Sequence, residues 1–273
     1  MSGAKSPFSQ PVPIAASARY DSIMVSSSCP WPVASEQPRL SPGGVHVWCL
    51  ALDLAEKQVD QFRATLSADE RERADRYHFD RHRRRFMACR GQVRRILAGY
   101  LNARPAALGF QYGTRGKPAL AAPWSDSEIQ FNVSNSDDVA LLAIALGREL
   151  GVDVEHVREP RDFESLAAQF FDAGEVAHLR SLPVQQRREA FFHCWTRKEA
   201  VLKAVGTGLA FPLDKVIVTL RPHEPARVVS LNSDKADPVN WWLESLNPLP
   251  EYVGALAAKG SALALLCWRF EEP

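Results

Sequence analysis

Residues 151–155 read Gly-Val-Asp-Val-Glu, a short stretch in which apolar and acidic side chains alternate. Successive side chains of a β-strand point to opposite faces, so Asp153 and Glu155 are predicted to share one face, with Val152 and Val154 in the core. Two neighbouring carboxylates repel each other unless a cation lies between them. Their hard oxygen atoms favour Mg²⁺, or alternatively Mn²⁺, over Zn²⁺. A solvated strand face that carries two acids is an equally good interpretation of these residues alone.

A helical pattern follows at residues 191–204, which read Phe-Phe-His-Cys-Trp-Thr-Arg-Lys-Glu-Ala-Val-Leu-Lys-Ala and end near Gly206. On a helix, Trp195, Glu199 and Lys203 are spaced by four residues and share a face. A glutamate and a lysine one turn apart usually form only a surface pair worth roughly 0.2–0.5 kcal/mol. If that face borders a cleft, however, Glu199 supplies a third metal oxygen and Lys203 a cation for a phosphate.

The same order of elements is predicted twice, at an offset of about 105 residues. Each copy begins with a strand, continues with a short helix and ends with a long helix. In the first copy the short helix opens on a capping box at Ser67 and Glu70. Six identities lie at this offset: Val47 and Val152, Ala68 and Ala173, Glu70 and Glu175, Phe86 and Phe191, Cys89 and Cys194, and Leu97 and Leu202. Because six matches are only modestly above chance, the matching order of elements carries the inference of a duplication.

We therefore predict an α+β fold of two similar halves related by pseudo-twofold symmetry, with the active site in the cleft between them. The N-terminal α+β half is expected over residues 44–148, and the C-terminal α+β half, with the metal site, over residues 149–273. Residues 1–43 are rich in Ser and Pro and lack a sustained apolar period, which predicts a disordered leader. A cleft inside one chain needs no second copy, so a monomer is expected.

Composition excludes several classes of protein. Lys plus Arg number 33 and Asp plus Glu 32, so no global field favours nucleic acid or a membrane surface. The longest apolar stretch, residues 262–268, is far shorter than the roughly 20 residues that span a bilayer. Five scattered cysteines without a CxxC pair disfavour a disulfide framework or a zinc site. With no signal-peptide core at the N-terminus, a cytoplasmic protein is expected.

Together the motifs resemble a known family. GVDVE at residues 151–155 followed by WTRKEAVLK at residues 195–203 is similar to the signature of the Sfp-type 4′-phosphopantetheinyl transferases, in the subgroup with tryptophan before the KEA triplet. Residues 116–118 resemble the family's GKP turn, and residues 131–136, FNVSNS, its FNxSHS segment. The resemblance covers roughly residues 45–220. It implies Mg²⁺-dependent transfer of the 4′-phosphopantetheine arm of coenzyme A to a serine of an apo acyl or peptidyl carrier protein, with release of 3′,5′-ADP.

The resemblance also implies roles for individual residues. By this resemblance, the metal ligands would be Asp153, Glu155 and Glu199. The catalytic residues would be Glu199 and Lys203, and Lys203 would also contact a phosphate of coenzyme A. Contacts to the nucleotide end of coenzyme A would come from Lys117 and Ser134 and, by a looser match, from Arg73 and Arg76 near the 3′-phosphate. The sequence leaves open which carrier is modified: one of fatty-acid, polyketide or nonribosomal-peptide biosynthesis, or the reductase of lysine biosynthesis.

Two features modify this expectation. Asn135 stands where the family usually has a histidine that touches the pyrophosphate; asparagine donates a hydrogen bond but carries no charge. Residues 81–85, Arg-His-Arg-Arg-Arg, are the densest group of cations, and such runs are often solvated helix faces. In the functional interpretation, some of these cations contact the 3′-phosphate of coenzyme A, and Arg85 is the expected contact. The others contact the acidic surface of a carrier protein.

Two other functions use the same residues. A metal-dependent hydrolase of a nucleotide pyrophosphate would need the same acids and cations, with water in place of the protein acceptor. A non-catalytic module that binds coenzyme A or a carrier protein is the second alternative. The intact set of Asp153, Glu155, Glu199 and Lys203 argues against it, and Asn135 argues for it.

Overall fold

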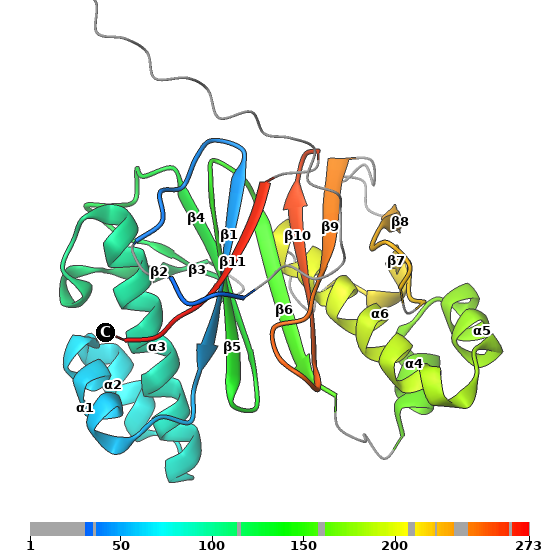
Figure 1. The fold of residues 1–273 in the computed structure, drawn as a ribbon, viewed down its shortest axis with the longest axis horizontal. Coiled ribbons are helices and arrows are strands. Elements are labelled where there is room, and N and C mark those ends of the chain that lie inside the picture. Colours follow the sequence, from blue (N-terminus) through cyan, green and yellow to red (C-terminus); the bar gives the residue numbers. More distant parts are fainter. Residues whose placement is uncertain are drawn as a thin grey trace, which may run out of the picture.

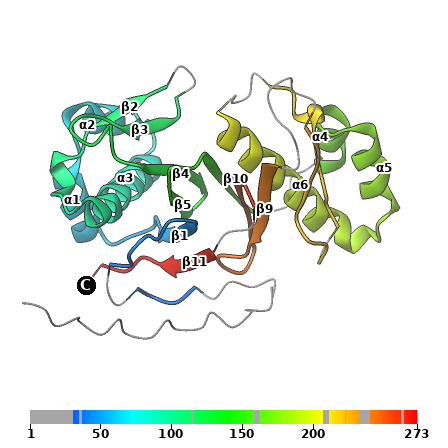
Figure 2. The ribbon, with the colours of Figure 1, turned by 90° about the horizontal axis from the view of Figure 1, so that it is seen from above.

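The computed structural model describes residues 31–34, 37–113, 116–157, 162–206, 211–221, 223–231, 240–261 and 264–272 of the 273 residues. Two sheets lie next to each other in the middle of the molecule, and two groups of helices flank them from opposite sides (Figures 1 and 2). Within the described ranges, no helix is long and apolar enough to cross a membrane.

The first half runs from β1 to β5. Its elements are β1 (Gly44–Ala51), α1 (Glu56–Thr65), α2 (Ala68–Asp75), α3 (Asp80–Leu101), the 3-10 turn η1 (Pro105–Ala107), β2 (Phe110–Tyr112), β3 (Pro118–Leu120), β4 (Ile129–Ser136) and β5 (Val139–Leu146). β2 and β3 form a separate hairpin, while β5 pairs antiparallel with both β1 and β4.

The second half repeats this plan. Its elements are β6 (Leu150–His156), α4 (Phe163–Phe170), α5 (Ala173–Ser181), α6 (Val184–Val205), η3 (Leu213–Lys215), β7 (Val216–Val218), β8 (Val228–Leu231), β9 (Trp241–Leu246) and β10 (Tyr252–Lys259), followed by β11 (Ala264–Arg269). β10 pairs antiparallel with both β6 and β9, as β5 does with β1 and β4. The predicted α+β fold of two similar halves is therefore confirmed.

The long helices α3 and α6 refine the alignment of the two halves. Both contain 22 residues, and both end at a left-handed C-cap, Asn102 after α3 and Gly206 after α6. Their bounds match at an offset of 104, whereas the capping-box glutamates Glu70 and Glu175 match at 105. The predicted pairs in the long helices, such as Cys89 with Cys194, are thus out of register by one residue. The segment between capping box and long helix is one residue shorter in the second half, which causes the shift.

A buried cation stabilises the equivalent corner of each half. In the first, Arg94 donates to Glu70 at 2.6 Å and to two carbonyl oxygens at the ends of η1. In the second, Lys198 lies 2.6 Å from Glu175 and donates to two carbonyl oxygens at the ends of η3. Buried charges are tolerated when they are paired and hydrogen-bonded, as both of these cations are. Lys198, in the KEA triplet, is therefore a structural residue.

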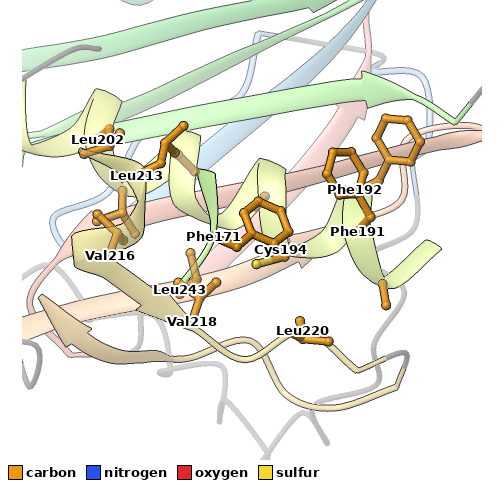
Figure 3. Packing of buried hydrophobic residues seen from close by; sticks show 14 of the residues in the cluster. Phe171, Phe191, Phe192, Cys194, Leu202, Leu213, Val216, Val218, Leu220 and Leu243 are labelled. Atoms are coloured by element: carbon orange, nitrogen blue, oxygen red, sulfur yellow. The ribbon is translucent and has the colours of Figure 1, made fainter. Parts of the chain in front are cut away.

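Apolar packing fixes α6 over the second sheet. Phe171, Phe191, Leu202, Val218 and Leu243 are among the buried residues that meet between α6, β7 and β9 (Figure 3). A second cluster lies between the two sheets and joins the halves, with Val47 from β1, Leu141 from β5 and Val152 from β6. Because the halves share this core, the seam between them is a rigid place for a site.

The two ends of the chain do not follow the predicted boundaries of the two halves and the leader. β11 lies beyond the second half in sequence but pairs in parallel with β1 of the first half. Its Arg269 donates from the backbone to the carbonyl of Pro32 and from Nε to that of Trp31. The prediction of a disordered leader is wrong for residues 31–34 and 37–43, because apolar side chains such as Leu40 pack on the cores. Residues 1–30 of the predicted leader lie outside the described residues.

Candidate functional site

Strand β4 borders β6 where the two halves meet, and polar side chains of β4 hold the two strands together. Three alternate residues of β4 each bond to β6: Asn132 Oδ1 accepts from Val152 N at 2.9 Å, Ser134 Oγ donates to Asp153 Oδ1 at 2.8 Å, and Ser136 Oγ donates to Glu155 Oε2 at 2.7 Å. Asp153 and Glu155 thus face the seam from one side of their strand. Val152 and Val154 are buried in the core, as the alternation predicts.

Helix α6 approaches β6 closely enough for its side chains to join these acids. A Cβ atom added at Gly151 would lie 2.2 Å from the carbonyl oxygen of Ala200, so the strand needs glycine at this position. From the last turn of α6, Lys203 Nζ donates to Asp153 Oδ1 at 2.6 Å and to Ser134 Oγ at 2.8 Å. The site therefore combines residues of β4, β6 and α6.

Two carboxylate oxygens at the seam are buried without a hydrogen-bond partner: Asp153 Oδ2 and Glu199 Oε1. Burial raises the pKa of Glu199 above its usual range, and the carboxylate of Asp153 raises it further, while Lys203 opposes the shift. Buried, unsatisfied oxygens that repel one another suit a hard cation. The donor set therefore fits Mg²⁺.

The acids are not, however, preassembled as a metal site. Among the described residues, no three His, Cys, Asp or Glu side chains group closely enough to hold an ion. The ammonium of Lys203 already neutralises Asp153, and Ser136 bonds Glu155. Ligation by Asp153, Glu155 and Glu199 therefore stays a prediction.

A pocket of about 480 Å³ opens on the first half, between α2, α3 and the ends of β3 and β4. Its cationic wall consists of Arg73, Arg81, Arg85 and Arg90, and His82 lies in the lining with them. Aromatic side chains, among them Tyr77, Phe86 and Tyr112, form another part of the lining, and Gly116, Pro118 and Asn135 complete it near the seam. A pocket with this mixture of cations and rings suits a phosphorylated nucleotide.

Arg85 is fixed in the wall of this pocket. It donates from Nε and Nη2 to the two carboxylate oxygens of Asp53, at 2.6 Å each, and from Nη1 to Asp137. These acids, Asp53 above all, raise the pKa of Arg85. Because two carboxylates already neutralise Arg85, the positive potential of the pocket comes mainly from Arg73 and Arg81.

Three predicted contacts to the nucleotide end of coenzyme A lie outside the pocket lining. Ser134 bonds Asp153 and Lys203 at the seam. Lys117 Nζ donates to the carbonyl oxygens of Leu150 at 3.0 Å and Lys203 at 2.9 Å, so it links β6 to α6 and does not line the pocket. Burial lowers its pKa. Arg76 lies outside the pocket lining and forms an exposed pair with Glu72 at 3.8 Å. The structure thus gives Lys117 a structural position and leaves Arg76 on the surface.

Several residues of the seam and of the pocket lining were not singled out from the sequence. Ser136 and Asn132 could have been found, because with Ser134 they repeat every second residue along a strand. Arg90 lies five residues after Arg85, a spacing that does not place the two on one helix face, so the pattern of cations did not indicate it. Tyr112 comes from a hairpin distant in sequence, and no local pattern places it at the pocket.

Comparisons with known proteins agree with this geometry. A family model described as "4′-phosphopantetheinyl transferase superfamily" matches residues 149–257, and one described as "4′-phosphopantetheinyl transferase, N-terminal" matches residues 54–146. The two family models therefore match the two halves of the chain in turn.

Individual relatives support the same assignment. The "4′-phosphopantetheinyl transferase HetI" of Nostoc sp. is 42% identical over 226 residues, which are 83% of this chain and 92% of the relative. A relative from Synechocystis sp. is 34% identical, over 68% of this chain and 74% of its own length. The "4′-phosphopantetheinyl transferase" of Bacillus subtilis is 26% identical, over 67% and 84% respectively. The chain belongs to the 4′-phosphopantetheinyl transferase superfamily.

Proposed function

We propose that this protein transfers the 4′-phosphopantetheine arm of coenzyme A to a serine of an apo acyl or peptidyl carrier protein, releasing 3′,5′-ADP. The observation that carries the proposal is the group of Asp153, Glu199 and Lys203 at the seam, next to a cationic pocket, in a chain of this family. We further propose that the protein acts as a cytoplasmic monomer.

In this proposal the 3′,5′-ADP portion of coenzyme A occupies the cationic pocket. Arg73 and Arg81 line it without a neutralising ion pair among the described contacts, so they are suited to the 3′-phosphate. The pyrophosphate lies toward the seam, where Asn135 faces the pocket and Lys203 supplies a positive charge. Lys203 stabilises the charge that develops on the departing phosphate.

The reaction breaks the phosphoanhydride bond of coenzyme A and forms a phosphoester bond to the carrier serine. The carrier serine oxygen bonds to the phosphorus that bears the pantetheine arm, and the bond from that phosphorus to the bridging oxygen breaks, with its electron pair leaving on 3′,5′-ADP. The serine proton must pass to a base, because the neutral hydroxyl is a poor nucleophile. Glu199 is suited to this role, since burial and Asp153 raise its pKa.

Magnesium fits the same cluster. Asp153, Glu155 and Glu199 would hold it, and when bound it neutralises charge on the pyrophosphate. A carboxylate that holds a cation becomes less basic, so bound Mg²⁺ would lower the proton affinity of Glu199.

Release of 3′,5′-ADP distinguishes this proposal from its alternatives. We expect the protein to release 3′,5′-ADP from coenzyme A only when an apo carrier protein is present, measured by chromatography of the nucleotides. Release without an acceptor would contradict the proposal and favour a hydrolase, and binding without release would favour a non-catalytic module.

Removal of the metal gives a second prediction. Chelation with EDTA should abolish transfer, and Mg²⁺ should restore it. In the absence of substrates, Mg²⁺ should also raise the melting temperature of the wild-type protein by relieving repulsion at the seam. Asp153→Asn should lose most of this shift in a thermal unfolding assay. An equal shift in Asp153→Asn would contradict metal binding at this site.

Replacing Asn135 with histidine is expected to make the affinity for coenzyme A depend on pH. Asn135→His should tighten binding of coenzyme A at pH 5.5 relative to the wild type, because an imidazolium adds a charge beside the phosphates. At pH 8 the neutral imidazole should leave affinity within about twofold of the wild type. Calorimetric titration at both pH values checks this. The same gain at both would show that charge is not the cause.

A further inference from the structure

Residues 116–118 connect the cationic pocket to the second half of the molecule. Gly116 and Pro118 line the pocket, whereas Lys117 between them does not. The ammonium of Lys117 instead reaches the second half, where it donates to the carbonyl oxygens of Leu150 at 3.0 Å and Lys203 at 2.9 Å. One short segment therefore borders the proposed nucleotide site and bonds the second half.

The two carbonyl oxygens belong to the end of a helix and the start of a strand. Lys203 lies in the last turn of α6, and Leu150 is the first residue of β6. Carbonyls of a last helical turn have no partner within their helix, and the helix dipole favours a cation near them. Lys117 thus satisfies the end of α6 and ties it to the strand that carries Asp153 and Glu155.

Beside these bonds, the helix and the strand contact each other through backbone atoms. A Cβ atom added at Gly151 would lie 2.2 Å from the carbonyl oxygen of Ala200 and 2.4 Å from the nitrogen of Ala204. Gly151 therefore has no side chain that could interlock with α6. The bonds from Lys117 add a fixed distance and direction that packing at this point does not supply.

Lys203, whose main chain Lys117 holds, uses its side chain at the seam. Lys203 Nζ donates to Asp153 Oδ1 at 2.6 Å and to Ser134 Oγ at 2.8 Å. A movement of the last turn of α6 would carry this ammonium away from both partners, because the carbonyl and the side chain belong to one residue. The position of Lys203 Nζ therefore depends on the bonds from Lys117.

The charge of Lys117 is directed at these carbonyl oxygens. Within the described part of the chain Lys117 forms no ion pair, and the neighbouring acid Glu149 is paired with Lys259 at 3.2 Å. Burial lowers the pKa of Lys117, and the charge of Glu149 opposes this shift. The ammonium therefore bonds the backbone of α6 and β6 rather than a counter-ion.

We propose that Lys117 is a positioning residue: by holding the last turn of α6 against β6, it places the ammonium of Lys203 beside the pyrophosphate of coenzyme A. The inference rests on the proposed function, and it differs from the direct contact to the nucleotide that the resemblance implies for Lys117. Because Lys203 stabilises charge that develops during transfer, its displacement should lower kcat. Binding of the nucleotide in the cationic pocket should be retained.

Removal of the ammonium tests the proposal. Lys117→Met keeps the aliphatic stem without the donors, and Lys117→Arg keeps donors for both carbonyl oxygens. The matched control is Lys259→Met, which loses only the exposed pair with Glu149. Transfer to an apo carrier protein at saturating coenzyme A gives kcat, and calorimetry gives the affinity for 3′,5′-ADP.

The variants should differ in rate and not in nucleotide affinity. Lys117→Met should lower kcat about tenfold, as expected for a displaced catalytic group, and change the affinity for 3′,5′-ADP less than about twofold. Lys117→Arg should recover most of the rate, and Lys259→Met should behave as the wild type.

A double variant separates positioning from general stability. In a Lys203→Met background, the added Lys117→Met should lower kcat less than about twofold, because no ammonium is left to position. The same loss in both backgrounds would assign Lys117 a structural role alone and overturn the proposal.

Other results would overturn it as well. Weaker binding of 3′,5′-ADP by Lys117→Met would assign Lys117 a direct contact to the nucleotide, and wild-type kcat would show that its bonds do not position Lys203. If Lys117→Met does not fold, Lys117→Gln, which keeps one donor group, is measured against the same criteria. Wild-type protein that transfers to no carrier would remove the proposed function itself, whereas failure of the inference alone leaves the wild type active.

Discussion

Replacing Glu199 with glutamine is expected to lower the rate of transfer by about 10³-fold, because a general base contributes roughly 10²–10⁴. Glutamine keeps the size of the side chain but cannot take the serine proton, and it is a weaker ligand for Mg²⁺. The rate is measured as formation of modified carrier protein at saturating coenzyme A. Near-normal turnover of the variant would show that Glu199 is neither base nor metal ligand.

Stability measurements on Glu199→Gln would test whether the loss of transfer is local to the site. Because the folded protein raises the pKa of Glu199 above its ordinary 4.5, the native state binds this proton more tightly than the unfolded state. The free energy of unfolding of the metal-free wild type should therefore fall as the pH rises from the unfolded pKa through the folded one. Glu199→Gln should lack this decline and be at least as stable as the wild type at pH 7, as judged by urea unfolding without metal.

Replacing Lys198 with methionine is expected to destabilise the fold by about 3–5 kcal/mol, the usual effect of removing one partner of a buried ion pair. Lys198 has 0% of its surface exposed, and its removal leaves the Glu175 carboxylate without its counter-ion and two carbonyl oxygens without their donor. Urea unfolding at pH 7 measures the change. The matched control is Lys215→Met, which breaks an exposed pair with Asp214 and should change stability by less than about 1 kcal/mol.

The outcome separates two interpretations of the KEA triplet. If Lys198→Met unfolded with wild-type stability and lost only transfer, Lys198 would belong to the catalytic machinery. We expect the opposite result. Lys198→Met should be less stable than the wild type, but at 15 °C, where the variant is still folded, it should transfer at close to the wild-type rate. This contrasts with Glu199, the next residue, whose replacement should affect transfer alone.

Local patterns in the sequence predicted much of the fold. Alternation at residues 151–155 predicted the strand that carries Asp153 and Glu155, and four-residue spacing predicted that Glu199 and Lys203 share a face of α6. Repetition of the element order predicted the two halves. These features depend on periodicities of two and 3.6 residues, which a sequence shows directly.

Features that depend on distant contacts were not predictable. The pairing of β11 with β1 joins the last strand to the first, and nothing in either segment specifies the partner. Lys117 and Lys198 look like ordinary surface cations in sequence, and only the fold shows that carbonyl oxygens surround each ammonium. Likewise, Arg81 and Gln185 become equivalent only when the helix bounds are known.

The most direct test of the proposed transfer is the intact mass of an apo carrier protein after incubation with this protein, coenzyme A and Mg²⁺. A gain of about 340 Da, the mass of the transferred arm, is expected on the carrier, and it should disappear with EDTA or when the acceptor serine is replaced by alanine. An unchanged mass for every carrier in a panel of acyl and peptidyl carrier proteins, from an enzyme shown to be folded, would contradict the proposal.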